Sequence, residues 1–300
     1  MKAIVVRETG GPEVLKLEDA PDPEPSDGQV LVRIAVAGLN PIEYKQRRGI
    51  TPKELPAILG SDFSGVVERS LAPELSEGTE VFGFAASGAY AELAVTPAAI
   101  VAEKPPGISH DQAAALPVAA LTAYQALFDR GRLEGGQRVL IAGASGGVGG
   151  FAVQLAKRAG AHVIGLGSAS NRDYVRSLGA TDYVDYTSED VTQVVADVDL
   201  AFDAVGGATT QALLATVRDG GTLVGIAGAM PETDPSSGIR AELLIMSPKQ
   251  EQLVLMGNLV AEGALRVEIA QRFALADAAK AHEMSETGRT RGKILLEIGS

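Results

Sequence analysis

The sequence contains no cysteine, which excludes disulfide bonds, a thiolate nucleophile and any zinc site built from cysteine ligands. It also lacks an apolar run of transmembrane length, and its first residues lead into a strand-like pattern without a signal-peptide h-region, so we expect a cytoplasmic protein. Basic residues are in the minority, 26 against 38 acidic ones, which gives a net charge of −12. This balance argues against nucleic acid and anionic membranes as partners.

What the chain does contain is typical of a globular enzyme. Hydrophobic residues make up 46% and charged residues 21% of the chain, a balance that excludes intrinsic disorder. The length of 300 residues is enough for two domains with cores of their own.

The most informative stretch runs from residue 139 to residue 149. A short apolar run leads into a glycine-rich turn, and an amphipathic segment follows at helical spacing, which predicts a strand, a tight loop and a helix. In that context the loop predicts a dinucleotide site, because the pyrophosphate binds the free N–H groups at the helix N-terminus. Gly146 and Gly149 match the second and third glycines of the G-x-G-x-x-G pattern, and Ala144 replaces the first. We therefore expect cofactor contacts from Ala144, Ser145, Gly146, Gly147, Val148 and Gly149.

The hydrophobic pattern divides the chain into three parts, 1–118, 119–247 and 248–300. The first part has short alternating runs separated by turn signals, which predicts a β-rich domain. The second part alternates apolar strands with helical patterns, which is typical of a doubly wound parallel sheet. The third part contains a helix and then returns to strand-like segments. The main expected strands are 29–36, 63–68, 90–95, 139–142, 162–166, 199–205, 222–227, 242–246, 265–273 and 293–298, and the main expected helices are 152–159, 172–178, 209–217, 251–262 and 278–284.

Several segments, in order along essentially the whole chain, resemble one family. They are residues 37–43, 59–67, 88–92, 113–116, 122–124, 202–207 and 292–296, together with the glycine loop. The chain resembles the zinc-free quinone oxidoreductases (zeta-crystallin-like) among the medium-chain dehydrogenases/reductases, close to the alkenal and enone reductases. The resemblance implies an α/β fold with a GroES-like β-rich catalytic domain, completed by the C-terminal segment, and a Rossmann domain.

The resemblance also predicts that no metal takes part. In zinc alcohol dehydrogenases of this superfamily a cysteine ligand stands at the position of Asn40, and a histidine stands at the position of Ser61. The three histidines, His110, His162 and His282, lack metal-ligand spacing and are expected at surface or packing positions. Without a metal nothing lowers the pKa of an alcohol towards 7, so alcohol oxidation is disfavoured.

The chemistry that needs no metal is hydride transfer to an acceptor that is already electrophilic, a quinone or an α,β-unsaturated carbonyl compound. Similar proteins line their substrate cleft with the loop that holds Asn40, Tyr44 and Lys45, and we expect the catalytic groups there. The amide of Asn40 can donate to a carbonyl oxygen or to the nicotinamide ribose, with a plain Asn-Pro turn as the alternative. Tyr44 and Lys45 are candidate proton sources, with a solvent-facing position as the alternative, and Asp62 is expected to order the loop.

The sequence predicts NADPH as the cofactor. NAD-specific relatives carry an acidic residue at the end of the second Rossmann strand, and Gly167 stands at that position here. Ser168 and Arg172 can then donate to a 2′-phosphate, and by resemblance Tyr186 reaches the same group. The alternative for Arg172 is a solvated position in the first turn of a helix.

The resemblance implies further cofactor contacts at the carboxyl ends of strands, where ligands bind in open α/β sheets. For Val205 and Ile226 the alternative is ordinary strand core. The expected contacts are Thr122, Val205, Gly206, Ile226, Ala227 and Gly228.

We therefore expect a zinc-independent NADPH-dependent reductase of a small quinone or enone. The alternatives are an enoyl reductase of a biosynthetic pathway and a non-catalytic NADPH-binding redox sensor. The apolar run 241–246 predicts an edge strand, and relatives pair this edge across a two-fold axis, so we expect a homodimer.

Overall fold

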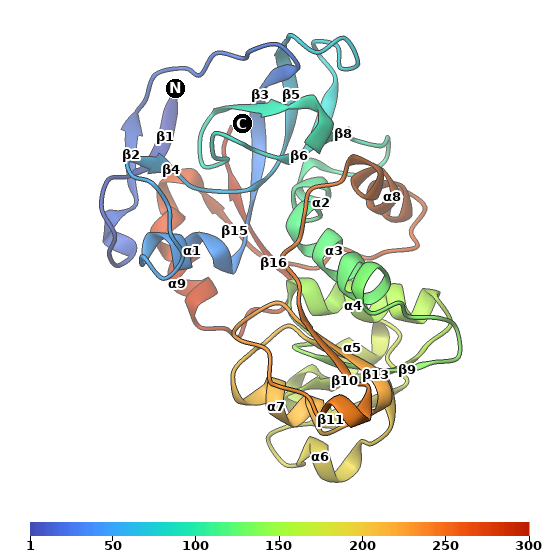
Figure 1. Ribbon diagram of the computed structural model, residues 1–300. Coiled ribbons are helices and arrows are strands. Elements are labelled where there is room, and N and C mark those ends of the chain that lie inside the picture. The colour runs from blue at the N-terminus through green and yellow to red at the C-terminus, as the bar shows by residue number, and fades with distance from the viewer. Residues whose placement is uncertain (300) are drawn as a thin grey trace. The chain divides into compact units, whose positions relative to one another are not determined.

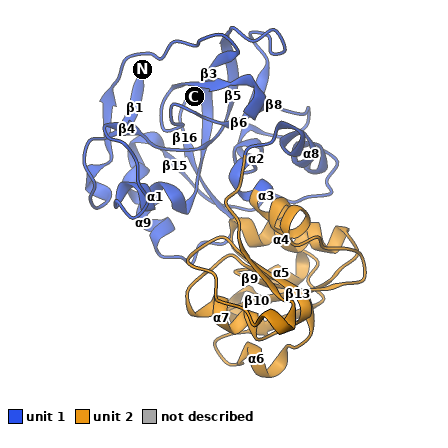
Figure 2. Ribbon diagram, in the orientation of Figure 1, with its two compact units in different colours: residues 1–121, 248–300 blue, residues 122–247 orange. Residues whose placement is uncertain are grey.

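The computed structural model describes residues 1–299. The chain divides into two compact units, which Figure 2 shows in blue and orange. Unit 1 combines Met1–Leu121 with Pro248–Ser300, and unit 2 is Thr122–Ser247. The first limit therefore falls after residue 121, where the sequence pattern placed it after residue 118.

Unit 1 is built on mostly antiparallel β-structure, with one parallel pair of strands at the edge of its larger sheet. A three-stranded sheet has the order β2 (Lys16–Asp19), β1 (Lys2–Val6), β4 (Ala57–Ile58). A seven-stranded sheet has the order β15 (Ile269–Ala274), β16 (Lys293–Glu297), β3 (Gln29–Leu39), β5 (Asp62–Ser70), β6 (Glu80–Phe84), β8 (Val101–Glu103), with β7 (Leu93–Pro97) also paired to β3. In Figure 1 the red β16 lies beside the blue β3, so the end of the chain completes a sheet that its beginning starts.

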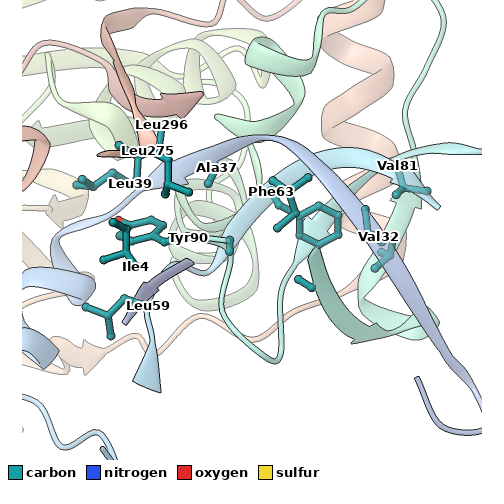
Figure 3. Packing of buried hydrophobic residues seen from close by; sticks show 14 of the residues in the cluster. Ile4, Val32, Ala37, Leu39, Leu59, Phe63, Val81, Tyr90, Leu275 and Leu296 are labelled. Carbon is teal, nitrogen blue, oxygen red and sulfur yellow. The ribbon is translucent and has the colours of Figure 1, made fainter. Parts of the chain in front are cut away.

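Alternating side chains of these strands form the core of unit 1. Figure 3 shows this core around Phe63 and Tyr90, with Ile4, Val32 and Leu296 among the buried residues that share it. The helices of unit 1 are α1 (Pro41–Arg47), α2 (His110–Ala114), α8 (Gln250–Ala261) and α9 (Ala278–Glu286). Its short 3-10 helices are η1 (Pro12–Val14), η2 (Ala98–Ile100) and η6 (Leu275–Asp277). Helix α3 (Pro117–Tyr124) spans the limit between the units.

Unit 2 is a six-stranded parallel sheet with helices in its crossover connections. The strand order is β11 (Asp182–Asp185), β10 (His162–Gly167), β9 (Arg138–Ala142), β12 (Val198–Asp203), β13 (Val217–Gly225), β14 (Arg240–Leu243). Numbered within the unit this order is 3-2-1-4-5-6, which confirms the expected doubly wound Rossmann sheet. The helices are α4 (Gly147–Arg158), α5 (Arg172–Ser177), α6 (Val191–Val194) and α7 (Ala208–Leu214), with a π-helical turn η3 (Gln125–Arg130) and the 3-10 helices η4 (Ala169–Asn171) and η5 (Pro235–Ser237).

Several expected elements need correction. The segment after Asn40, expected as a loop, is helix α1, and proline at the first helical position with Glu43 at the third explains why it begins there. The strand expected at 90–95 begins only at Leu93, because Tyr90 lies in a bend and Ala91 pairs with Ala3 of β1 through an isolated bridge. The helix expected at 209–217 ends at Leu214. No helix in residues 1–299 is long and apolar enough to span a membrane.

Candidate functional site

The glycine loop joins β9 to α4 and is the first part of the candidate cofactor site in unit 2. Gly143 follows β9 with a φ of 69°, and the N–H of Gly146 donates to its carbonyl at 2.9 Å, which closes a tight turn. Gly146 is the N-cap of α4, a helix of 12 residues. The first N–H groups of such a helix have no partner within it and carry its positive dipole end, so the loop can hold an anion.

Backbone packing explains which positions of the loop are glycine. A Cβ on Gly149 would lie 2.1 Å from the carbonyl oxygen of Gly143, so only glycine lets α4 start this close to the loop. The left-handed residue of the turn is Gly143 and not its successor. Ala144 can therefore carry a methyl group, which is fully buried, and this accounts for its departure from the glycine pattern.

The end of β10 forms the next part of the candidate site. A Cβ on Gly167 would lie 2.5 Å from the hydroxyl of Tyr183, which donates to the carbonyl of Ser168 at 2.6 Å. The guanidinium of Arg172 lies 5.2 Å from the centroid of the Tyr183 ring, within the range of a cation–π contact. The structure thus brings Ser168 and Arg172 to one strand end. Tyr183 positions them, a role that the sequence reasoning missed.

The neighbouring strand end supplies Tyr186 and acidic residues. Tyr186 is 63% exposed, and its N–H donates to the carbonyl of Gly167. Asp185 accepts from the N–H and hydroxyl of Thr187, and these bonds lower the pKa of the Asp185 carboxyl. The Asp185 carboxylate therefore hydrogen-bonds within its own turn. It does not replace the acidic residue that NAD-specific relatives carry at the position of Gly167. Glu189 lies 3.9 Å from Arg172, too far for a hydrogen bond.

The ends of β12 and β13 lie against the same loop. A Cβ on Gly143 would lie 3.2 Å from the Val205 side chain, and one on Gly206 would lie 2.8 Å from the carbonyl of Ala227. Val205 follows β12 and is 54% exposed, so its reading as strand core was wrong. Buried Asp203 fixes this corner by accepting from the N–H groups of Val205 and Gly206 at 2.8 and 2.9 Å.

The remaining expected cofactor contacts differ in their surroundings. Ile226 follows the end of β13 and is half-buried, and its N–H donates to the carbonyl of Asp203 at 3.1 Å. Gly228 has a φ of 78° and is exposed. Thr122 is buried on α3, and its contact with a cofactor stays a prediction.

Unit 1 contains the other candidate residues, and strand register brings three of them together. Asn40 follows β3, Asp62 begins β5 and Lys293 begins β16, and β3 pairs with both of the other strands. The Asn40 amide donates to Asp62 Oδ2 at 2.9 Å, and its Oδ1 accepts from the Lys293 ammonium. Asp62 Oδ1 accepts from the N–H of Val118 at 3.0 Å. All three side chains are buried, and Lys293 is the member that the sequence reasoning did not assign.

Tyr44 and Lys45 lie on α1, the helix that Asn40 precedes. Both are half-buried, and neither side chain has a hydrogen-bond partner within residues 1–299. The structure therefore leaves their solvent-facing and proton-donating interpretations both open.

Glu43 fixes the start of α1 through the backbone N–H of Asn40. It is fully buried, and its carboxylate accepts from the N–H of Asn40 at 2.6 Å and from the N–H of Ser61 at 3.2 Å. Burial raises the pKa of the Glu43 carboxyl to about 7, and the charge of Asp62 adds to this rise, whereas Lys293 opposes it. Burial likewise raises the pKa of Asp62.

We predict that Glu43 makes stability fall as pH rises. Its pKa is about 7 when folded and near 4.5 when unfolded, so the stability it contributes is complete below the lower value and is lost as pH rises through the upper one. In urea unfolding, the free energy of the parent protein should fall relative to Glu43→Gln by on the order of 2 kcal/mol between about pH 5 and about pH 8. Parallel pH curves for the two proteins would contradict this assignment.

The histidines occupy structural positions. His110 Nδ1 lies 2.8 Å from Ser64 Oγ, and His162 Nε2 lies 2.6 Å from Asp182 Oδ2. His282 is fully buried beside Tyr90, and burial lowers its pKa to about 3, which keeps the ring neutral. No group of three or more histidine, aspartate and glutamate side chains within the described chain has a geometry that could hold a metal ion.

Two family models match the chain. Residues 26–106 match the alcohol dehydrogenase GroES-like domain, and residues 178–296 match the zinc-binding dehydrogenase family. A GroES-like unit together with a six-stranded parallel sheet and its glycine loop defines a medium-chain dehydrogenase/reductase.

Comparison with individual proteins narrows this class. A quinone oxidoreductase of Pseudomonas aeruginosa is 35% identical over 96% of both chains. An NADPH-dependent alkenal/one oxidoreductase of Arabidopsis thaliana is 31% identical over 99% of this chain and 79% of its own. The structure of an Escherichia coli quinone oxidoreductase complexed with NADPH superposes with a TM-score of 0.92 at 28% identity, covering 99% of this chain and 100% of that one. The chain belongs to the quinone oxidoreductase family and is an oxidoreductase.

Proposed function

We propose that the protein is an NADPH-dependent reductase that transfers a hydride to a quinone or to the β-carbon of an α,β-unsaturated carbonyl compound, without zinc. The observation that carries this proposal is the buried cluster of Asn40, Asp62 and Lys293. It is held by hydrogen bonds at the sequence position where zinc dehydrogenases carry a metal ligand. The names of the Pseudomonas and Arabidopsis relatives support both acceptor classes.

NADPH fits the residues that line the strand ends of unit 2. The glycine loop offers the free N–H groups of α4 to a pyrophosphate, and the close approach of Gly149 to Gly143 fixes where this helix begins. Gly167 removes the carboxylate that would repel a 2′-phosphate, and Ser168 and Arg172 supply donors beside it. The Arabidopsis relative is named as NADPH-dependent, which agrees with this choice.

We predict that NADPH binds at least about tenfold more tightly than NADH, because one charge-assisted bond to the 2′-phosphate exceeds the ~1.4 kcal/mol that this ratio needs. Arg172→Ala should remove most of the preference and leave NADH affinity unchanged, as measured by fluorescence titration. Arg158→Ala is the matched control, because Arg158 is exposed in the last turn of α4. Equal affinities for both cofactors in the parent protein would refute the assignment.

The side chains of unit 1 would hold the acceptor and its developing charge. NADPH, when bound, supplies the hydride. Reduction of a quinone or enone spreads the negative charge over a hydroquinone anion or enolate, which one donor can stabilise. The Asn40 amide is that donor, or it holds the nicotinamide in place. Tyr44 and Lys45, both on α1, are the candidate sources of the proton that completes the reaction.

The same cluster makes a catalytic zinc ion unnecessary. Asn40 and Ser61 replace the cysteine and histidine ligands of zinc dehydrogenases, and the Asn40 amide is already held by a carboxylate and an ammonium group. The Ser61 N–H is bound to Glu43. Hydrogen bonds within the protein therefore hold Asn40 and Ser61 in place without a metal ion. One matching family model is nevertheless named for zinc binding.

An acceptor screen tests the proposal. NADPH oxidation should be fast with quinones or conjugated enals and enones, and negligible in the reverse direction with simple primary alcohols and NADP. Turnover confined to enoyl thioesters would instead identify an enoyl reductase of a biosynthetic pathway. Tight NADPH binding with no turnover of any acceptor would identify a redox sensor.

We also propose a small-molecule acceptor as the only ligand besides the cofactor, and a cytoplasmic location. The net charge of −12 gives no support for nucleic acid or anionic membranes. The Arabidopsis relative is named as chloroplastic, so a fluorescent fusion in the source cell is the test of location.

We propose that the protein is a homodimer paired through β14. This strand is the edge of the six-stranded sheet. The apolar side chains of Leu243, its last residue, and of Ile245, two residues beyond its end, are 46% and 82% exposed. Analytical ultracentrifugation at micromolar concentration should give twice the chain mass, and Ile245→Asp should shift the equilibrium to monomer. Val254→Asp, an exposed position on α8, is the control that should not. A parent protein that sediments as a monomer would exclude the dimer.

A further inference from the structure

Lys293 is a buried lysine whose three ammonium protons all have acceptors. It is the first residue of β16, and its side chain is 5% exposed. Nζ donates to the carbonyl of Leu39 at 3.1 Å, to Asp62 Oδ2 at 3.3 Å and to Asn40 Oδ1. An ammonium group has three donors and no acceptor, so this set is complete.

The two charged neighbours of Asn40 fix which way its amide faces. Lys293 can only donate, so it requires the amide oxygen, and the Asp62 carboxylate requires the amide nitrogen, which lies 2.9 Å away. The N–H of Val118 and the Lys293 ammonium both donate to Asp62, and these contacts oppose the rise that burial causes in the pKa of its carboxyl. A flipped amide would place NH₂ against an ammonium group and oxygen against a carboxylate.

This arrangement leaves one donor unused. The Asn40 amide has two N–H bonds, of which Asp62 accepts one, and the other has no partner within residues 1–299. The backbone N–H of Asn40 is already bound to Glu43. Asn40 is 3% exposed, and this second N–H, held in one orientation, is the donor of its amide that the described residues leave for a ligand.

We propose that Lys293 is a positioning residue for the reduction, which holds the Asn40 amide so that its one free N–H meets the carbonyl oxygen of the acceptor or the nicotinamide. The inference rests on the proposed function and deepens it. Lys293 touches neither substrate nor cofactor in this account and acts through Asn40. Without the ammonium group, the Asp62 carboxyl can take up a proton and both orientations of the amide become available.

The kinetic test is a double-mutant cycle on the full chain. Lys293→Met keeps an unbranched apolar side chain without the ammonium group and should lower kcat/KM by about tenfold or more, as Asn40→Ala is expected to do, with NADPH affinity changed by less than about threefold. In an Asn40→Ala background the same substitution should change kcat/KM by less than about twofold. Independent, multiplying losses would overturn the proposal. Lys280→Met, at an exposed lysine of α9, is the matched control.

A second variant separates orientation from burial of charge. The double variant Asp62→Asn, Lys293→Met removes both charges and leaves no unpaired buried ion from this pair. It is therefore the variant to measure if Lys293→Met alone does not fold. Its kcat/KM should stay low, because a neutral pair no longer dictates the orientation of Asn40. Recovery of parental kcat/KM in this variant would show that Lys293 only neutralises Asp62, and would refute the proposal.

A spectroscopic readout keeps the inference separate from the proposed function. The side-chain NH₂ signals of Asn40 in a ¹H–¹⁵N spectrum can be assigned by their loss in Asn40→Ala. In the parent protein they should be sharp and slow to exchange with solvent, and in Lys293→Met they should shift and exchange at least about tenfold faster. Unchanged signals would overturn the inference. Absence of any acceptor turnover in the parent protein would count against the proposed function alone.

Discussion

Gly149→Ala should weaken NADPH binding by roughly a hundredfold, equivalent to about 2.7 kcal/mol. The added methyl group would meet the carbonyl oxygen of Gly143 at 2.1 Å, and both contacting groups are backbone, so α4 must move away from the loop. The N–H groups at the start of the helix would then no longer converge on a pyrophosphate. The same overpacking should cost about 1–3 kcal/mol of folding stability. Isothermal titration and urea unfolding measure the two effects.

Gly150→Ala is the matched control for this substitution, one residue further along α4. Its added methyl group would lie 3.5 Å from the side chains of Leu178 and Tyr174, an ordinary contact. Alanine also favours the helix interior by about 0.5–1 kcal/mol over glycine, so the control should be slightly more stable and should bind NADPH as the parent does. Equal NADPH affinity for the Gly149 variant and this control would remove the glycine loop from the cofactor site.

Asn40→Ala should lower kcat/KM by about tenfold or more while NADPH still binds. The substitution removes the candidate donor to the acceptor and leaves Lys293 and Asp62 each without one hydrogen-bond partner. Stopped-flow kinetics of NADPH oxidation and a cofactor titration separate the two quantities, and Asn258→Ala, at an exposed position on α8, is the control. Parental rates in the Asn40 variant would transfer the catalytic role to Tyr44 or Lys45, or to alignment of the reactants alone.

The sequence predicts unit 2 well because its signals are local. The strand, the glycine loop and the helix follow one another directly over residues 138–158, and the central strands of the sheet are apolar runs. Because Gly143 takes the left-handed conformation of the turn, alanine is tolerated at position 144. Strand β12 ends before Val205, whose side chain is exposed. Tyr183 was missed because its contact with Arg172 joins the start of α5 to strand β11, and the local pattern of neither element contains this contact.

The cluster in unit 1 depends on contacts that local patterns do not contain. Lys293 meets Asn40 only because β16 pairs with β3, a contact between residues 253 positions apart. A lysine that begins a strand is usually solvent-exposed, so nothing near Lys293 marks it as buried. Helix α1 did carry a local signal, in Pro41 and Glu43, but seven residues show too little periodicity to distinguish a helix from a loop.

The central claim is direct hydride transfer to an electrophilic acceptor without a metal. The most direct test follows deuterium from NADPH labelled at C4, in each of its two stereochemical forms, through enzyme from which metals have been removed with a chelator. The account predicts that one of the two forms delivers one deuterium per product to the β-carbon of a conjugated enone, at the same rate as untreated enzyme supplied with the same labelled cofactor. Product without deuterium from either form, or turnover that returns only when zinc is added, would contradict it.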